Sequence, residues 1–388
     1  MLTNNKDISV YIHWPFCVKK CPYCDFNSHV SKSKIKNDEW EKSFKSEITM
    51  EQNLLGPRKI KSIFFGGGTP SLMPTYLIES ILNQLAKKWV FSKNIEITIE
   101  ANPSSVEVKN FKALKKAGVN RLSIGLQSLN NNSLKFLGRN HSAQDGLNAL
   151  EIAKQCFKRI SFDLIYGLPN QNEKTWEKEL KEAINLAGEH ISAYQLTIEK
   201  GTPFYASYRD GKFSIPEEEV LLNLYNMTDD LLKSANLEKY EVSNYAIKGA
   251  ECVHNLGIWQ GREYCGIGPG AHGRIILNKQ WYATQKFSAP TVWLNKIFEK
   301  KTTFYEKTEI SNKTRVKEIL LTGLRIRKGV NIEKLFDNLN IQKDDSIINK
   351  KECDNLNKLG LIENNNDILR ITKKGIPVLN HILNKIIL

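Results

Sequence analysis

Residues 9–29, SVYIHWPFCVKKCPYCDFNSH, place a short apolar run directly before three closely spaced cysteines. The run at 9–13 is rich in Val, Ile and Tyr, which is typical of a buried β-strand. Cys17, Cys21 and Cys24 follow within eight residues, whereas the other four cysteines of the chain are scattered. Three thiols in so short a segment are rarely a chance cluster, so this stretch predicts a metal site on the loop after a first strand.

Five further apolar runs follow, separated by amphipathic segments. The expected strands cover 60–65, 95–100, 121–125, 160–166 and 191–197, and the expected helices cover 38–54, 74–89, 105–117, 142–155 and 173–186. This alternation predicts an α/β fold with a parallel sheet and a site at the carboxyl ends of its strands. Six units are fewer than the eight of a closed barrel, so we expect a partial (β/α)6 TIM-type barrel. A doubly wound sheet is the alternative.

The alternation ends near residue 204. A helix is expected over 216–235, followed by a Gly-rich stretch at 252–273. Helices over 313–324, 332–339 and 347–359, with a hairpin over 361–371, are typical of a small winged-helix unit. We therefore expect a barrel at 1–204, a middle region at 205–305 and a winged-helix-like C-terminal domain at 306–388, the last two forming an α+β extension.

The composition excludes several classes of protein. The 388 residues include 56 Lys and Arg against 42 Asp and Glu, a net charge of +14, but these charges form no basic tract. We interpret them as general solvation and expect no nucleic-acid partner, although a winged helix used as a nucleic-acid module is a weaker alternative. No apolar run approaches the ~20 residues of a membrane span. The N-terminus lacks a secretory pattern, so a cytoplasmic location is expected.

The spacing of the three cysteines narrows the choice of metal site. Zinc sites usually have four ligands, often in two separated pairs. Three thiolates on one loop instead suit a [4Fe–4S] cluster with one iron left open. A zinc site completed by His13 or His29 is the alternative.

Cys-x-x-x-Cys-x-x-Cys after a first strand resembles the radical S-adenosylmethionine (SAM) superfamily. Further segments resemble its anaerobic coproporphyrinogen dehydrogenase-like (HemN-like) family, in the same order: YIHWPFC at 11–17, GGGTP at 66–70, IEANP at 99–103, SIGLQS at 123–128, LGRNH at 137–141 and FDLIYGLP at 162–169. The resemblance covers residues 9 to about 273, and the C-terminal unit also fits. It implies a [4Fe–4S] cluster whose unique iron binds SAM.

The resemblance also implies individual roles. It assigns the cluster to Cys17, Cys21 and Cys24, and contacts with the cofactors to Tyr11, Tyr23, Gly67, Gly68, Thr69, Glu100, Gln127, Arg139 and Asp163. The residues support part of this assignment directly. Glycine lets a backbone approach a ligand closely because it has no Cβ. Glu100 and Asp163 follow apolar runs at strand ends, where a carboxylate is costly unless it is paired or bound to a ligand.

Two branches of the family share these motifs. The dehydrogenase carries a fourth cysteine two residues after the third, and this chain has Phe26 at that position. The dehydrogenase also carries a long N-terminal extension before the segment that corresponds to Tyr11 and the residues after it. CPYCDFNSH at 21–29 instead resembles the heme-chaperone (HemW) branch. That branch carries His-Asn-x-x-Tyr-Trp, a motif implicated in heme binding. Here HNLGIW at 254–259 keeps His, Asn and Trp but has Ile258 for Tyr, and it makes His254 the expected heme contact.

The heme-chaperone resemblance implies a protein that binds a [4Fe–4S] cluster, SAM and heme. It makes the middle region at 205–305 the one nearest to substrate or heme. The expected partners are an electron donor for the cluster and heme-accepting proteins such as respiratory enzymes, including acceptors at the membrane. Whether SAM is cleaved stays open. The alternatives are an oxygen-independent coproporphyrinogen III oxidase of porphyrin biosynthesis and, less favoured, a methyltransferase on the same scaffold.

GPGAHG at 268–273 matches the G-x-G-x-x-G pattern of dinucleotide sites. That pattern has a mechanism only between a strand and a helix, and neither is expected here. We interpret the segment as a tight structural loop.

Overall fold

The computed structural model describes residues 6–31, 35–342, 347–365 and 367–388. Six parallel strands lie side by side in chain order: β1 (Asp7–Trp14), β4 (Lys59–Gly67), β5 (Val90–Ala101), β6 (Arg121–Gln127), β7 (Arg159–Tyr166) and β8 (His190–Gln195). Each contains most of one apolar run expected from the sequence. The partial parallel barrel is confirmed, and the strand order is sequential rather than doubly wound.

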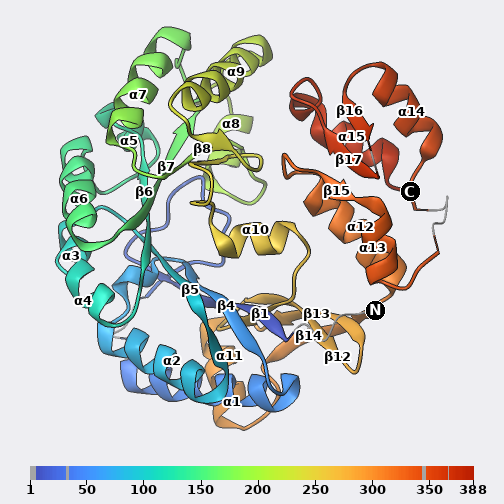
Figure 1. Ribbon diagram of the computed structural model, residues 1–388. Coiled ribbons are helices and arrows are strands. Elements are labelled where there is room, and N and C mark those ends of the chain that lie inside the picture. The colour runs from blue at the N-terminus through green and yellow to red at the C-terminus, as the bar shows by residue number, and fades with distance from the viewer. Residues whose placement is uncertain (1–5, 32–34, 343–346, 366) are drawn as a thin grey trace.

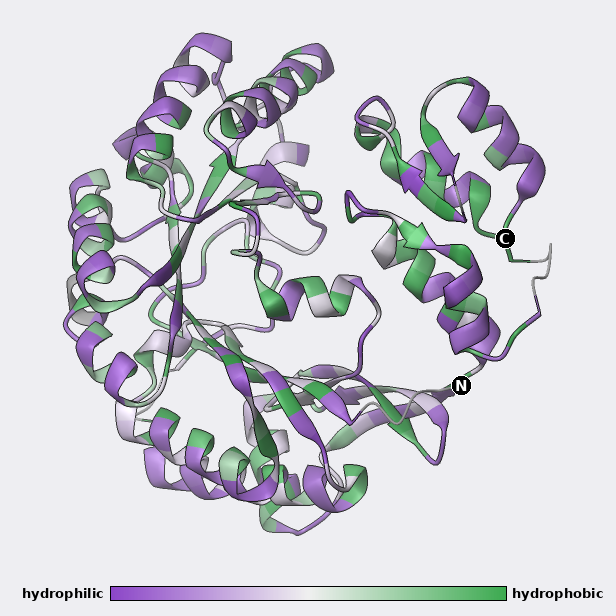
Figure 2. Ribbon diagram, in the orientation of Figure 1, coloured by the Kyte–Doolittle hydropathy of each residue, from purple (hydrophilic) through white to green (hydrophobic). Residues whose placement is uncertain are grey.

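Helices cover the outside of these strands (Figure 1). They are α1 (Asn37–Leu55), α2 (Thr75–Lys88), α3 (Ser105–Val108), α4 (Phe111–Lys116), α5 (Asn131–Phe136), α6 (Ala143–Cys156) and α7 (Glu173–Leu186). The expected helix at 105–117 is divided in two, because the N–H of Asn110 bonds to the carbonyl of Glu107, three residues back, in a tighter turn. Hydrophilic residues lie on the outer faces of the helices, as amphipathic elements require (Figure 2).

The sheet extends beyond the barrel at both edges, to twelve strands within the described residues. At one edge β11 (Tyr264–Ile267) pairs with β1 in parallel, and β12 (His272–Leu277), β13 (Gln280–Lys286) and β14 (Phe304–Ile310) follow antiparallel. At the other edge lie β10 (Asn244–Ala246) and β9 (Glu238–Lys239). We did not expect β11 and β12 from the sequence, because glycines interrupt their apolar pattern. GPGAHG therefore does follow a strand, but it leads into β12 and not into a helix.

Further elements connect these strands or pack beside the barrel. They are β2 (Phe16–Cys17), β3 (His29–Val30), the 3-10 helix η1 (Pro70–Leu72), α8 (Pro203–Arg209), α9 (Glu218–Ser234), α10 (Val253–Trp259) and α11 (Pro290–Phe298). Figure 1 shows α10 inside the ring that the strands form, close to the C-terminal unit. The barrel interior is therefore occupied by protein at that level.

The C-terminal unit has a core of its own, whose buried members include Val316, Leu320, Phe336, Ile362 and Ile382. It contains α12 (Asn312–Gly323), β15 (Val330–Asn331), α13 (Ile332–Asn338), α14 (Lys350–Lys358), β16 (Ile362–Asn365), β17 (Ile368–Ile371), η2 (Ile376–Val378) and α15 (Leu379–Ile386). The three small strands form a sheet in the order β15-β17-β16. Of the helix expected at 347–359, residues 350–358 are helical.

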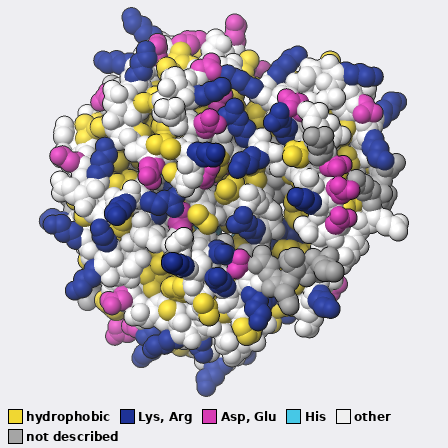
Figure 3. Space-filling view, in the orientation of Figure 1, with side chains coloured by type: hydrophobic (Ala, Val, Ile, Leu, Met, Phe, Trp, Pro, Cys, Tyr) yellow, Lys and Arg dark blue, Asp and Glu magenta, His cyan; other side chains and the backbone are white. Residues whose placement is uncertain are grey.

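The surface and the helices can be compared with two interpretations of the sequence, that of the net charge and that of membrane spans. On the face in Figure 3, Lys and Arg side chains are spread widely, with Asp and Glu between them, which agrees with charge used for solvation. Within the ranges that the structure describes, no helix is both long and apolar enough to span a bilayer.

Candidate functional site

A cavity of about 510 Å³ opens at the carboxyl ends of the parallel strands. Eleven of the residues singled out from the sequence line it, namely Cys17, Cys21, Tyr23, Cys24, Gly67, Gly68, Thr69, Glu100, Gln127, Arg139 and Asp163. They come from the cysteine loop, from β4 to β7 or the residues that follow these strands, and, for Arg139, from the loop after α5. Parallel strands place their carboxyl ends at one edge, which is why residues so distant in the chain meet here.

The cysteine loop is closed by short local pairings. β2 and β3 pair in parallel, Phe16 with His29 and Cys17 with Val30, so the loop leaves and returns at one point. Within it the N–H of Cys24 bonds to the carbonyl of Cys21 at 3.1 Å. Burial raises the pKa of the Cys17 thiol, while a hydrogen bond from Thr69 opposes that rise. A bound metal would favour the thiolate of Cys17.

A chain of hydrogen bonds joins two of the cysteines. Thr69 Oγ1 donates to Cys17 Sγ at 3.5 Å and accepts from Asn102 Nδ2 at 3.2 Å. Arg139 donates to Asn102 Oδ1 through Nη2 and to Cys21 Sγ through Nη1, the latter at 3.5 Å. We call Cys17–Thr69–Asn102–Arg139–Cys21 the thiol arc. It orients two sulfurs from two strand ends and from the loop after α5, as outer residues around a metal site do.

Two glycines of GGGTP have a packing reason in addition to their place in the cavity wall. A Cβ on Gly67, whose φ is +112°, would lie 2.6 Å from the His13 ring, and a Cβ on Gly68 would lie 2.7 Å from the carbonyl oxygen of Phe16. A side chain at Gly67 would push β4 away from β1, and one at Gly68 would push it away from Phe16 at the start of the cysteine loop. The glycines thus allow a close approach, as the sequence predicted, and the approaching partners are the protein's own His13 ring and the backbone of Phe16.

Two carboxyl groups face the barrel interior. Burial and, to a smaller extent, the charge of Asp163 raise the pKa of Glu100 to about 8, although a hydrogen bond from the backbone N–H of Gly67 opposes that rise. Burial also raises the pKa of Asp163 to about 6, against a hydrogen bond from Ser192 and the charge of Arg121. Carboxyls kept partly neutral in this way favour a cationic or hydroxyl-bearing ligand, which would stabilise the charged form or share its proton.

Gln127 ends β6 in an unusual backbone conformation. Its φ is +70°, in the left-handed region that non-glycine residues rarely adopt. Such a conformation is costly and concentrates at functional sites. Gln127 and Arg139 both approach Gly125, where a Cβ would lie 2.9 Å from Gln127 Nε2 and 3.5 Å from Arg139 Nη2. The end of β6 is therefore shaped by side chains that line the cavity.

Asn27 is a site residue that motif reading did not select. Its Nδ2 donates to the carbonyls of Pro269 and Ser288 at 3.1 and 3.0 Å, and Oδ1 bonds with the His29 ring at 3.0 Å. The His13 ring bonds with the Asn27 carbonyl at 2.9 Å. Asn27 thus fixes the cysteine loop to the segment after β11. Both histidines already use a ring nitrogen here, which weighs against a zinc site completed by either.

Asn102 is the second such residue. It lies within the IEANP segment, yet nothing in the spacing separates it from its neighbours. A polar side chain at the end of a buried strand could have identified Asn102, just as it identified Glu100 two residues earlier.

Tyr11 and His254 do not line this cavity. The Tyr11 hydroxyl bonds with the His13 ring at 3.0 Å, and its own ring stacks on Phe64. His254 lies on α10 and is 2% exposed, with Nδ1 3.1 Å from Ser62 Oγ and Nε2 buried without a partner among the described residues. A heme iron could reach His254 only if α10 left the barrel. The heme contact expected of His254 is therefore untested, and its burial weighs against that role.

Across the described residues, no three Cys, His, Asp or Glu side chains converge closely enough to hold a single metal ion. Each thiolate of a [4Fe–4S] site binds a different iron, so three cluster ligands need not converge so tightly. The donor set of three cysteines on one clamped loop fits such a cluster. Phe26, at the position of the fourth cysteine of the dehydrogenase branch, is 58% exposed and contributes a ring to the cavity wall.

Comparison with known proteins defines the class first. The family model of the Radical SAM superfamily matches residues 11–183, and that of the HemN C-terminal domain matches residues 310–378. The solved structure of coproporphyrinogen III oxidase (HemN) from Escherichia coli superposes with a TM-score of 0.82 at 21% identity, covering 99% of this chain and 91% of that one. The fold and the cysteine loop are those of a radical SAM protein.

Closer relatives define the branch. The heme chaperone HemW of Buchnera aphidicola subsp. Acyrthosiphon pisum is 37% identical over 97% of both chains. HemW of Escherichia coli K12 is 39% identical over 70% of this chain and 71% of its own. A mitochondrial radical SAM domain-containing protein 1 from Danio rerio is 37% identical over 84% of this chain and 74% of its own. The chain belongs to the HemW-like branch of the HemN family.

Proposed function

We propose that the protein is a heme chaperone that binds a [4Fe–4S] cluster and SAM and passes heme to acceptor proteins in the cytoplasm or at the membrane. In this proposal the barrel at 1–204 holds the cofactors, the middle region at 205–305 lies nearest to heme, and 306–388 is the winged-helix-like domain. The thiol arc is the observation that carries the cofactor assignment, because it prepares two sulfurs for a metal. The heme assignment rests on the HemW relatives and on Phe26.

Nine of the eleven predicted residues that line the cavity have a task in this proposal. Cys17, Cys21 and Cys24 hold the cluster, which when bound supplies an open iron for SAM and one electron from an external donor. Thr69 and Arg139 orient the first two thiolates through the arc. Glu100 and Asp163 accept the polar and cationic groups of SAM. Gly67 and Gly68 keep the backbone of β4 against the cysteine loop.

The test begins with anaerobic reconstitution and measures three quantities on one sample: iron per chain, heme bound, and heme transferred to an apo-heme protein. We expect a reconstituted cluster, stoichiometric heme and measurable transfer. The same sample is then given coproporphyrinogen III with SAM and a reductant. Formation of protoporphyrinogen would replace the chaperone assignment by that of the oxidase, whereas heme binding without transfer would remove the carrier step alone.

A further inference from the structure

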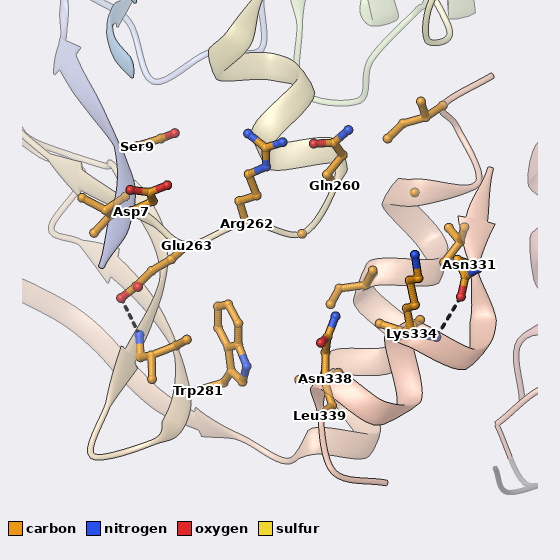
Figure 4. Close-up of a pocket in the computed structure, with 18 of the residues that line it drawn as sticks. Asp7, Ser9, Gln260, Arg262, Glu263, Trp281, Asn331, Lys334, Asn338 and Leu339 are labelled. Carbon is orange, nitrogen blue, oxygen red and sulfur yellow. Dashed lines mark hydrogen bonds between the residues drawn. The ribbon is translucent and has the colours of Figure 1, made fainter. Parts of the chain in front are cut away.

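A second cavity of the described chain lies away from the cofactor site. It has a volume of about 630 Å³, within the range of small-molecule sites, and it lies between the start of β1, the loop after α10 and the C-terminal unit (Figure 4). We call it the interdomain cleft. β1 runs for eight residues from the cleft toward the cysteine loop. At ~3.3 Å per residue, the two sites are about 25 Å apart.

Specific contacts hold the back wall of the interdomain cleft in place. Arg315 Nη2 donates to the carbonyl of Gly261 at 2.7 Å, and a Cβ on Gly261 would lie 2.5 Å from Ile319. On the other side Arg274 binds both carboxylate oxygens of Glu318. These contacts fix α12 against the loop that follows α10 and against β12, so the spacing of the two walls is set.

The walls are apolar with a flat aromatic floor. Trp281 contributes its indole (Figure 4), and the guanidinium of Arg315 covers that ring at 4.2 Å from its centroid. Ile319, Ile326 and Leu335 line the wall of the C-terminal unit. Such a lining favours a flat apolar molecule, which gains free energy when its apolar surface leaves water. Trp281 is only 6% exposed, so burial of apolar surface and not stacking on the indole carries this argument.

The charge that remains in the cleft is positive. Its two acidic residues are already paired, since Asp7 contacts Lys61 at 3.2 Å and Glu263 contacts Arg58 at 3.3 Å. Arg262 and Lys334 extend from opposite walls (Figure 4) and form no ion pair within the ranges that the structure describes. Two free cations facing an apolar slot suit a ligand with carboxylates at its edge.

We propose that the interdomain cleft binds a tetrapyrrole by its apolar face and its carboxylates, with Arg262 and Lys334 as the anionic-group contacts. This inference rests on the proposed function, which supplies heme as a flat, apolar dicarboxylate. The described lining contains no His, Cys, Met or Tyr, so the cleft offers no side chain that commonly ligates heme iron. A site without iron ligation holds heme in a form that an acceptor's own ligands can take.

The position of the cleft has a second consequence. HNLGIW leads directly into Gln260 and Arg262, which form the upper edge of the cleft (Figure 4). The segment expected to contact heme therefore borders the cleft, although its own histidine is buried. At about 25 Å from the cysteine loop, a molecule in the cleft is out of contact with the cofactors. Binding there is expected to be independent of SAM.

The test compares heme with metal-free protoporphyrin IX on the full-length protein, followed by tryptophan fluorescence quenching and absorption. We expect wild type to bind both with similar affinity, with or without SAM. In R262A/K334A we expect the affinity for both to fall about tenfold, since two charge-assisted contacts are lost. The matched control R327A/K328A removes two charges from the same unit outside the cleft and is expected to bind like wild type.

The outcomes separate this inference from the proposed function. Wild-type affinity in R262A/K334A, equal losses in R327A/K328A, or equal binding of the protoporphyrin dimethyl ester would overturn the cleft site. Binding of heme without any binding of protoporphyrin IX would also overturn it, because the contact would then be to iron, while heme carriage would stand. Binding of neither ligand by wild type would remove both proposals.

Discussion

The two ends of the barrel are both rich in polar groups, but they use them differently. At the amino end, α10 closes the interior, and its first turn is held by Glu96, which accepts from the backbone N–H of His254 at 3.1 Å. Arg159 pairs with Glu96 and donates to the carbonyls of Ala250 and Glu251. At the carboxyl end a cavity of about 510 Å³ remains, with carboxyls whose pKa values are raised by burial. Polar groups satisfied by protein stabilise a fold, whereas polar groups left facing a cavity are available to ligands.

The largest effect of a substitution is expected at the cysteine loop, where the proposed cluster binds at the carboxyl end of the barrel. Cys21→Ala removes one of the three thiolates expected to hold the cluster, so we expect complete loss of the broad visible absorption and of cluster iron after anaerobic reconstitution. Cys156→Ala is the control, because Cys156 is a buried thiol on the outer helix α6. Equal iron content in the two variants would mean that the cysteine loop is not the cluster site.

The sequence predicted the carboxyl end well and the amino end poorly, for a physical reason. Residues such as Cys17, Thr69 and Glu100 follow apolar runs directly, and parallel strands must bring their carboxyl ends together. His254 belongs to a motif in a Gly-rich stretch with no such geometric rule, and it is buried on a helix that the pattern did not reveal. Asn102 and Asn27 were missed because their roles depend on partners from other strands, which spacing within one segment does not specify.

Asn102→Ala tests whether the thiol arc works as a unit. The substitution removes the acceptor of Arg139 and the donor to Thr69 without touching a cysteine. We expect the cluster to form but to be lost to a chelator about 10–100-fold faster, as for other outer residues around metals. Asn148→Ala, on the exposed face of α6, is the control. Unchanged cluster loss would show that the arc is packing without influence on the metal.

His254→Ala tests the amino end. The side chain is 2% exposed and bonds to Ser62, so its removal leaves a cavity in a closed interior. We expect the free energy of unfolding to fall by about 2 kcal/mol, with heme affinity unchanged. Chemical denaturation and heme titration of the same sample measure both quantities, with exposed His381→Ala as the control. Lost heme affinity at full stability would instead make His254 a ligand and imply that α10 opens.

The smallest expected effect is the pH dependence of SAM binding at the carboxyl end of the barrel. Glu100 has a pKa of about 8 because of burial, so at neutral pH most of the free protein carries the neutral carboxyl. A cationic ligand such as SAM favours the ionised form, and binding must then release a proton. Affinity therefore rises with pH as long as the free carboxyl is protonated and levels off above its pKa. One released proton corresponds to about a tenfold gain between roughly pH 7 and roughly pH 8.5.

Glu100→Gln isolates this contribution, because the amide keeps the shape of the side chain but cannot titrate. Calorimetric SAM titrations in two buffers of different ionisation enthalpy count the protons released. We expect a smaller pH slope and fewer released protons in the variant, even though SAM itself and the nearby Asp163 still titrate. The same slope in both proteins would mean that Glu100 is ionised before SAM arrives. The carboxyl end would then resemble the site of Glu96 at the amino end, where the carboxylate is already paired with Arg159 and with the backbone N–H of His254.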